Sequence, residues 1–223
     1  MSVIVIGGMI GAGKTSVAKL LGEELGSDVF FEEVDNNPLL ELFYMADEAE
    51  EQEKRYPFLL QLTFLSSRFR SIKEALVDKN NVLDRSIYED WYFCKVNHEI
   101  GRISELEFKI YEELLENMME ELEELPKKAP DLMVYLHGSF EEIVRRIGTR
   151  GREFEQDNSL MAYYKTLWEG YDEWVDHHYD ASQVLKINID EYDVVHNPED
   201  AKEVVELVKN ALAVRDNQYI FEK

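Results

Sequence analysis

The chain has 223 residues, of which 45% are hydrophobic, a composition that suits one globular domain over residues 1–223. Its single cysteine, Cys94, excludes an internal disulfide framework and favours a reducing cytoplasmic location. Acidic residues outnumber basic ones by 47 to 24, and the resulting formal charge of −23 argues against nucleic acid and membrane surfaces as partners.

Short apolar segments alternate with helical patterns along the chain. β-Branched and aromatic runs predict strands at 3–6, 29–31, 82–83, 132–136 and 184–189. Apolar spacings of three and four predict helices at 14–25, from Asn37-Pro38 onward, at 57–77, at 106–122 and from Asn197-Pro198 onward. The charged segment 47–55 is interpreted as a solvated loop or helix end. This alternation predicts an α/β fold with a five-stranded parallel sheet and helices on both faces.

A glycine-rich loop lies between the first strand and the first helix. It matches the pattern G-x-x-x-x-G-K-[ST] in full, through Gly8, Met9, Ile10, Gly11, Ala12, Gly13, Lys14 and Thr15. In such a P-loop the backbone N–H groups surround phosphate oxygens, the lysine reaches the β and γ phosphates, and the hydroxyl binds Mg²⁺. The alternative is a plain glycine turn, but the flanking strand and helix favour an ATP-binding loop.

Four arginines gather within eight residues: Arg145, Arg146, Arg150 and Arg152. A charge run is usually a solvated face, and that is the alternative here. In an acidic chain with a P-loop, however, such cations suit a transferring phosphate. With Gly148 and Gly151 as flexible points, the segment at about 145–156 is interpreted as a lid.

Several spaced motifs now coincide: IGAGKT, EEVDNNPLL, QLTFLSSR, DRSIYED and RIGTRGRE. In this order they resemble the deoxyadenosine, deoxyguanosine and deoxycytidine kinase family, especially its bacterial members, over nearly the whole chain. The resemblance implies a P-loop kinase fold that uses ATP and Mg²⁺ to phosphorylate the 5′-hydroxyl of a deoxynucleoside for nucleotide salvage. It favours deoxyadenosine or deoxyguanosine, with deoxycytidine as an alternative.

The resemblance also assigns catalytic roles. Glu32 matches the general base of the family's E-P-V triplet, although the neighbouring Glu33 replaces the proline and competes for the role. Asp84 and Arg85 match the family's E-R-S motif, which implies that Asp84 helps Thr15 to hold Mg²⁺ while Arg85 orients the base and the phosphate. The remaining phosphate contacts fall to Lys14, Arg146, Arg150 and Arg152. A solvated carboxylate at Glu32, or a structural Asp84–Arg85 ion pair, is the alternative.

Further residues match the family's acceptor and donor contacts. Gln61, Arg68 and Asp90 correspond to the groups that read the nucleobase, and Tyr44 and Glu155 to the pair on the sugar 3′-hydroxyl. Asp190 and Tyr192 bound the segment that matches the loop around the ATP adenine. The family's base-stacking aromatic falls at Cys94, so Phe93 or Trp91 is expected to replace it.

The sequence leaves the partner and two other functions open. In the family, the helix that matches the Leu106–Leu122 stripe packs in a dimer, which implies a homodimer or a heterodimer with a related chain; ordinary core packing is the alternative. His177 and His178 lack further ligands at metal spacing and are interpreted as a helix end rather than a zinc site. A nucleoside monophosphate kinase and a non-catalytic kinase-fold subunit are the competing functions.

Overall fold

Five parallel strands form one sheet in the computed structural model, which describes residues 2–32, 37–75, 80–122 and 129–221, with side chains up to residue 214. Their order across the sheet is β2-β3-β1-β4-β5. The strands are β1 (Val3–Gly8), β2 (Asp28–Phe30), β3 (Asn81–Asp84), β4 (Leu132–His137) and β5 (Gln183–Asn188). Each predicted strand agrees with one of them to within one or two residues, so the α/β prediction is confirmed.

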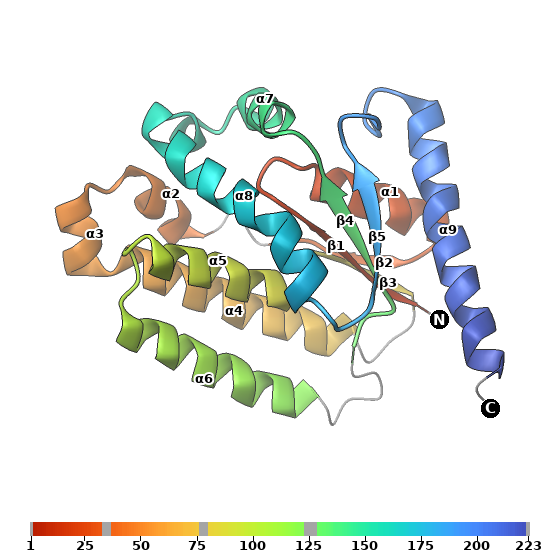
Figure 1. Cartoon of the computed structure of the whole chain (residues 1–223), viewed down its shortest axis with the longest axis horizontal. Coiled ribbons are helices and arrows are strands. Elements are labelled where there is room, and N and C mark those ends of the chain that lie inside the picture. Colours follow the sequence, from red (N-terminus) through yellow and green to blue (C-terminus); the bar gives the residue numbers. More distant parts are fainter. Residues whose placement is uncertain (1, 33–36, 76–79, 123–128, 222–223) are drawn as a thin grey trace.

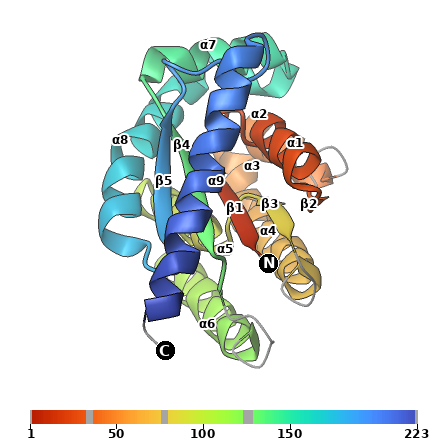
Figure 2. The ribbon, with the colours of Figure 1, turned by 90° about the vertical axis from the view of Figure 1, so that its right-hand side faces the viewer.

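Helices cover both faces of this sheet (Figures 1 and 2). They are α1 (Lys14–Leu25), α2 (Pro38–Met45), α3 (Glu48–Lys54), α4 (Tyr56–Ala75), α5 (Ile87–Glu99), α6 (Glu105–Leu122), α7 (Phe140–Arg150), α8 (Met161–His178) and α9 (Pro198–Phe221), with short 3₁₀ turns at Glu153–Glu155 and Asn158–Leu160. α1 and α9 cover one face, while α4, α5 and α8 cover the other and α6 packs outside α4 and α5. Within the described ranges, no helix is long and apolar enough to cross a bilayer.

The helix starts follow the caps expected from the sequence. The Asn37 side chain accepts a hydrogen bond from Leu39 N at 3.0 Å, and that of Asn197 accepts one from Glu199 N at 3.0 Å. At the other end of α1, Gly26 adopts φ 61°, the left-handed conformation that often closes a helix. These local signals explain why α1, α2 and α9 begin or end as predicted.

Three segments differ from the sequence predictions. The segment interpreted as a lid, at about 145–156, begins inside a helix, α7, whose start is capped by the Ser139 side chain. The charged segment 47–55 is a helix, α3, because the Asp47 side chain caps it by accepting from Glu50 N at 2.8 Å. α5 was not anticipated as a separate helix, since it is enclosed by α4, α6 and α8 and has buried residues on several sides. Such a helix lacks the one-sided apolar pattern that identifies surface helices in a sequence.

The strand order places the glycine-rich loop at the centre of the molecule. β1 lies between β3 and β4, so the chain proceeds to one side of β1 and later to the other. In open parallel sheets, ligands bind at the carboxyl ends of the strands where the order reverses in this way. Gly8 closes β1 with φ 140°, and a Cβ there would meet Leu136 O at 2.6 Å. The fold therefore requires glycine where the loop leaves the sheet.

Candidate active site

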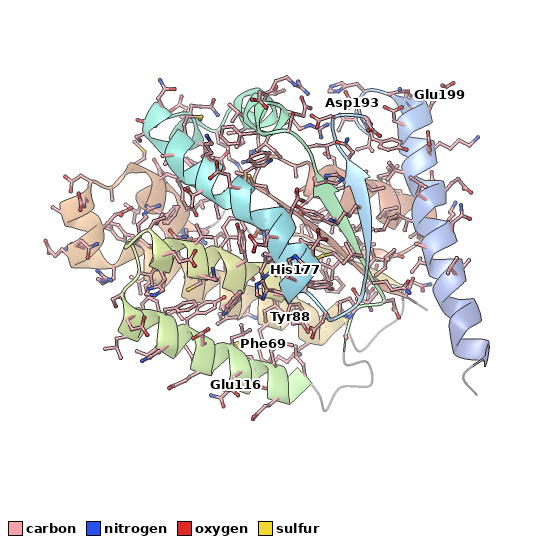
Figure 3. All side chains as sticks on the ribbon, in the orientation of Figure 1. Phe69, Tyr88, Glu116, His177, Asp193 and Glu199 are labelled. Atoms are coloured by element: carbon pink, nitrogen blue, oxygen red, sulfur yellow. The ribbon has the colours of Figure 1, made fainter. Side chains whose placement is uncertain are left out.

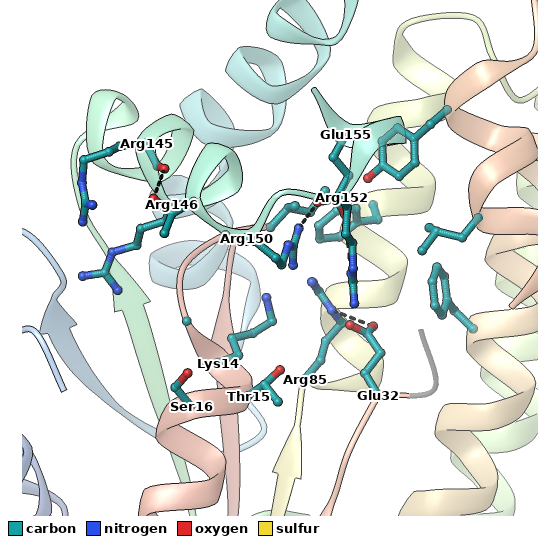
Figure 4. A pocket seen from close by; sticks show the side chains of 18 of the residues that line it. Lys14, Thr15, Ser16, Glu32, Arg85, Arg145, Arg146, Arg150, Arg152 and Glu155 are labelled. Carbon is teal, nitrogen blue, oxygen red and sulfur yellow. Dashed lines mark hydrogen bonds and ion pairs between the residues drawn. The ribbon is translucent and has the colours of Figure 1, made fainter. Parts of the chain in front are cut away.

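A cavity of about 440 Å³ opens at the carboxyl ends of the strands (Figure 4). The glycine-rich loop, α2, α4, α5, α7 and the loop after β5 contribute to its wall. Most predicted site residues line it: Ile10, Gly11, Gly13, Lys14, Thr15, Glu32, Tyr44, Gln61, Arg85, Asp90, Arg146, Arg150, Arg152 and Glu155. Residues scattered between positions 10 and 155 thus converge on one space.

The glycine-rich loop presents backbone donors to this cavity. Gly11 and Gly13 have φ values of 84° and 94°, and α1 begins directly afterwards without a side-chain cap at Gly13. Ser16 N and Val17 N donate to Gly13 O, each at 3.1 Å. The positive end of the helix at Lys14 and Thr15 lines the cavity, where it favours an anion. Lys14 Nζ donates to the carbonyls of Gly8 and Met9, at 2.8 and 2.9 Å. Burial, together with the charge of Arg85, lowers the pKa of Lys14 to about 7.

Thr15 and Asp84 meet beside the lysine. The Thr15 hydroxyl donates to Asp84 Oδ2 at 2.6 Å, and burial raises the pKa of the Asp84 carboxyl. The other carboxylate oxygen, Oδ1, is buried without a hydrogen-bond partner among the described residues. A hydroxyl and an uncommitted carboxylate oxygen are hard donors of the kind that Mg²⁺ takes beside substrate phosphates.

Glu32 lies between two arginines. Arg68 Nη2 donates to its Oε1 at 2.7 Å, and Arg85 Nε donates to the same oxygen at 3.1 Å. Burial disfavours the charged carboxylate, but Arg85 and Arg68 outweigh it and hold the pKa of Glu32 at about 2. Glu32 is therefore ionised throughout the physiological range. Glu33, its competitor for the role of base, lies outside the described residues.

Arg85 occupies a strained turn. Its φ of 87° is rare for a residue with a side chain, and such strain persists at functional sites when the surroundings enforce it. Its backbone N–H donates to Ile6 O at 3.0 Å, which ties the turn to β1. Its Nη1 is buried, has no hydrogen-bond partner in the described part of the chain, and lies 3.9 Å from Glu89 Oε1 in an ion pair. Arg85 also lines the cavity, where a guanidinium is suited to a phosphate oxygen.

Arg68 links Asp90 and the end of β3 to Glu32. It donates through Nε to Asp90 Oδ2 at 3.0 Å and through Nη1 to Asp84 O at 2.8 Å. Arg68 and Asp90 are 5% and 3% exposed, so the pair is buried. Gln61, on the same helix as Arg68, lines the cavity. The trio inferred from spacing is thus brought together by the fold.

The four lid arginines divide into two pairs (Figure 4). Arg145 is 60% exposed and binds Glu142, and Arg146 binds Glu142 at 2.6 Å and Ile189 O at 2.9 Å. Arg150 and Arg152 point into the cavity, and both form ion pairs with the buried carboxylate of Glu155. Arg146 is therefore anchored to the loop after β5, whereas Arg150 and Arg152 extend into the cavity.

Tyr44 lies next to this second pair. Its ring stacks on Phe154, with 5.6 Å between the centroids, and burial raises its pKa well above the ordinary value. It therefore stays protonated and can donate a hydrogen bond. Glu155, its predicted partner on the sugar, is already bound by the lid arginines, which the sequence did not indicate.

Two other expectations change in detail. Asp190 accepts hydrogen bonds from Ser139 N and Oγ, each at 2.7 Å, and the Tyr192 hydroxyl donates to Glu203 at 3.1 Å. Neither lines the cavity; from the same loop, Asp193, Val195 and His196 do. Of the expected substitutes for the aromatic at Cys94, Phe93 lines the cavity, whereas Trp91 donates to Glu112 away from it.

Glu89 was missed by sequence reasoning. It is fully buried, and its carboxylate accepts from Gly8 N at 2.8 Å, from Ser86 N at 2.8 Å and from the Tyr171 hydroxyl. It thereby joins the glycine-rich loop, the Arg85 turn and α8. The signal was present in the sequence, because Ser86 and Glu89 form a capping box at the start of α5.

The remaining titratable clusters do not add a second site. No group of three or more His, Cys, Asp or Glu side chains could hold a metal ion among the described residues. His177 lies at the end of α8 that is remote from the cavity, while Asp193 lies on the loop above the strand ends (Figure 3). The interpretation of His177 and His178 as a helix end agrees with this position.

Known proteins resemble the chain over nearly its whole length. The family model described as deoxynucleoside kinase matches residues 4–213. A deoxyguanosine kinase from Lactobacillus johnsonii is 49% identical, covering 92% of this chain and 90% of that protein. A deoxyadenosine kinase from Lactobacillus acidophilus is 44% identical, covering 95% and 97%. The structure of M. mycoides deoxyadenosine kinase with bound dATP has a TM-score of 0.75 at 27% identity, covering 95% and 99%. This chain belongs to the deoxynucleoside kinase family.

Proposed function

We propose that the protein transfers the γ-phosphoryl group of ATP to the 5′-hydroxyl of a purine deoxynucleoside, with deoxycytidine as a further substrate. One observation carries the proposal: Glu32 is bound by both Arg68 and Arg85. Arg68 also holds Asp90 at the acceptor end, while Arg85 lies in the phosphate region with Lys14. A hydroxyl held at Glu32 is therefore placed between a base-reading group and a phosphate-binding group.

The low pKa of Glu32 defines its part in the reaction. A carboxylate with a pKa near 2 is a weak base, but it accepts a hydrogen bond from a hydroxyl at any physiological pH. Phosphoryl transfer passes through a loose transition state in which the attacking hydroxyl needs little activation. Glu32 therefore orients the hydroxyl in line with the γ-phosphorus and takes its proton late in the transfer. The two arginines that bind Glu32 keep its carboxylate fixed.

Phosphate binding falls to the cations around the glycine-rich loop. Lys14, Arg85, Arg150 and Arg152 point into the same space, and the N-terminus of α1 adds backbone donors. Thr15 and Asp84 would hold Mg²⁺, which would neutralise charge on the phosphates of ATP. Arg146, bound to Glu142 and Ile189 O, fixes α7 against the loop after β5. That loop contributes Asp193, Val195 and His196 to the cavity wall, and these residues would face the donor base.

Base recognition rests on Gln61, Arg68 and Asp90. An amide and an arginine–carboxylate pair offer both donors and acceptors, and these match the edge of a purine or of cytosine. The relatives named deoxyguanosine and deoxyadenosine kinase, at 49% and 44% identity, support the purine assignment. Tyr44 and Glu155 would bind the sugar 3′-hydroxyl, which then competes with Arg150 and Arg152 for the Glu155 carboxylate.

The competing functions fit the cavity less well. A nucleoside monophosphate acceptor would bring its own negative phosphate to the place proposed for the 5′-hydroxyl. The ionised carboxylate of Glu32 lies there, and the two arginines beside it are already paired with that carboxylate. A non-catalytic subunit would have no need for Glu32 in a strained, buried arginine cluster. Neither alternative explains why Glu32 joins both halves of the site.

We also propose a dimer formed through α6. Leu106, Ile110 and Leu114 are 69%, 40% and 38% exposed and lie along one side of this helix. Large aliphatic side chains exposed at helical spacing are typical of helix-to-helix interfaces. Light scattering on the wild type and on Leu106→Glu tests this: loss of the dimer in the variant alone supports it, and a monomeric wild type contradicts it.

A substrate panel tests the proposed reaction. Purified protein is supplied with ATP and Mg²⁺ and with each deoxynucleoside or deoxynucleoside monophosphate. We expect 5′-monophosphates from deoxyguanosine and deoxyadenosine and weaker turnover of deoxycytidine. Phosphorylation of the monophosphates alone would establish the monophosphate kinase alternative instead.

A further inference from the structure

The short helix α2 forms one wall of the acceptor end of the cavity. Leu40, Phe43 and Tyr44 line the cavity from this helix, and the Tyr163 ring on α8 meets the Phe43 ring with 5.8 Å between the centroids. α2 has only eight residues, too few to be stable without contacts to other elements. The shape of the wall therefore depends on what holds α2 from behind.

Arg102, in the turn between α5 and α6, holds α2 from that side. Its Nη2 donates to Phe43 O at 2.9 Å, in the last turn of α2, where carbonyls lack partners within the helix. A cation at this end of a helix is also favoured by the helix dipole. Its guanidinium forms a two-pronged ion pair with Glu51 of α3, in which Nε donates to Oε2 at 3.2 Å. Arg102 therefore fixes both α2 and α3.

The same guanidinium covers two pocket rings. Its central carbon lies 4.0 Å from the Phe43 centroid and 5.4 Å from the Tyr163 centroid. Arg102 does not itself line the cavity, so it contacts these rings from outside. Its side chain is only 17% exposed and that of Glu51 only 10%, which limits competition from water. One residue thus sets the backbone of α2 and the positions of two aromatic walls.

We propose that Arg102, anchored by Glu51, is a positioning residue that sets the affinity of the acceptor site for the deoxynucleoside. This inference rests on the proposed function, because it takes the Phe43 and Tyr163 end of the cavity as the nucleoside site. The ATP site is built from the glycine-rich loop, α7 and the loop after β5, none of which Arg102 contacts through a hydrogen bond or ion pair. A change at Arg102 should therefore affect the acceptor and spare the donor.

The chain supplies a matched control in Arg55. Arg55 forms a comparable ion pair with Glu107 and donates to Gln52 Oε1 at 2.6 Å, and so ties α3 to α6. It contacts neither Phe43 nor Tyr163 by any described hydrogen bond or ring contact. Arg55→Met therefore removes a similar tie near α3 without touching the pocket rings.

The experiment measures KM for the deoxynucleoside and for ATP, the deoxynucleoside Kd by calorimetry, and Tm, in Arg102→Met, Arg102→Lys, Glu51→Gln and Arg55→Met. We expect Arg102→Met to raise the acceptor KM and Kd on the order of tenfold, with ATP KM within about twofold. Arg102→Lys should recover part of the affinity, because lysine keeps the charge without the planar fork. Glu51→Gln should shift the acceptor KM in the same direction by less. Arg55→Met should lower Tm and leave the acceptor KM near wild type.

Unchanged acceptor KM and Kd in Arg102→Met overturn the proposal, and so does an equal rise in Arg55→Met, which would indicate general loosening. If Arg102→Met fails to fold, Arg102→Lys and Glu51→Gln decide, and wild-type affinity in both overturns it. Wild-type protein that binds deoxynucleosides without phosphorylating them overturns only the proposed function, and Arg102 is then judged on Kd. Wild-type protein that binds no deoxynucleoside overturns both.

Discussion

Replacing Glu89 with glutamine tests how the glycine-rich loop is held in place relative to the turn at Arg85. The Glu89 carboxylate accepts from Gly8 N, at the start of the glycine-rich loop, and from Ser86 N, beside Arg85. It also accepts from the Tyr171 hydroxyl, so three donors meet one buried carboxylate. A glutamine has the same shape but only one oxygen, and at least one of the donors must face its NH₂ group.

The loss of stability expected in Glu89→Gln follows from the burial of this side chain. Glu89 is 0% exposed, so water cannot replace a lost partner. A buried donor left without an acceptor costs about 1–3 kcal/mol, and hydrogen bonds to a carboxylate are stronger than neutral ones. We therefore expect Glu89→Gln to lower stability by ~2–4 kcal/mol, which for a chain of this size lowers Tm by ~5–15 °C. Displacement of the loop relative to Arg85 should also lower kcat by about tenfold or more.

Thermal denaturation and steady-state kinetics are measured together, with Tyr171→Phe as the control. That variant removes one donor but leaves both backbone donors on Glu89, so we expect a loss of only about 1 kcal/mol and a small change in kcat. If the Glu89→Gln variant has a Tm within about 2 °C of the wild type and keeps its kcat, Glu89 does not hold the glycine-rich loop against the Arg85 turn.

Three further predictions concern charged groups in the cavity. Glu32→Gln should lower kcat by ~10²–10⁴ while ATP binding is retained in calorimetry, and a small effect would transfer the role of base to Glu33. Because the folded pKa of Glu32 is about 2, below its ordinary 4.5, its contribution to stability is present above pH 4.5 and lost as the pH falls toward 2. Acid titration followed by circular dichroism should show a smaller loss of stability in Glu32→Gln than in the wild type. Glu107 and Glu142 also have lowered pKa values and contribute equally to both proteins. Lys14 has a folded pKa of about 7, below its ordinary 10.5, so most of its side chains are neutral at pH 8. Phosphate binding favours the charged form, and ATP binding at pH 8 should therefore take up close to one proton. Calorimetry in buffers of different ionisation enthalpy measures this uptake, and binding heats that do not depend on the buffer would contradict it.

Local sequence signals predicted most of the fold. The run at Val3–Ile6, the glycine pattern after it and the caps at Asn37 and Asn197 each act over a few residues, and each element appears where expected. α3 was misjudged because its charges conceal a buried Glu51 that pairs with Arg102, a partner distant in the chain. α5 was overlooked because it is surrounded by other helices.

The candidate site was likewise predictable in its residues but not in their contacts. Family motifs located the residues that line the cavity, including Gln61 and Asp90 on different helices. They could not show that Glu155 is bound by lid arginines, or that the loop after β5 lines the cavity through Asp193 instead of Asp190. Those facts depend on side-chain directions, which are fixed only when the elements pack together.

The most direct test of the central claim is to follow the γ-phosphoryl group itself. Wild-type protein is incubated with ATP and Mg²⁺ and with deoxyguanosine or deoxyadenosine, and the product is identified by phosphorus NMR, alongside the matching 2′,5′-dideoxynucleoside. We predict phosphate esterified at the 5′-oxygen of the deoxynucleoside, ADP in equal amount, and no nucleoside product when the 5′-hydroxyl is absent. Phosphate at another position, or ATP hydrolysis without nucleoside phosphorylation, would contradict the placement of the acceptor hydroxyl at Glu32.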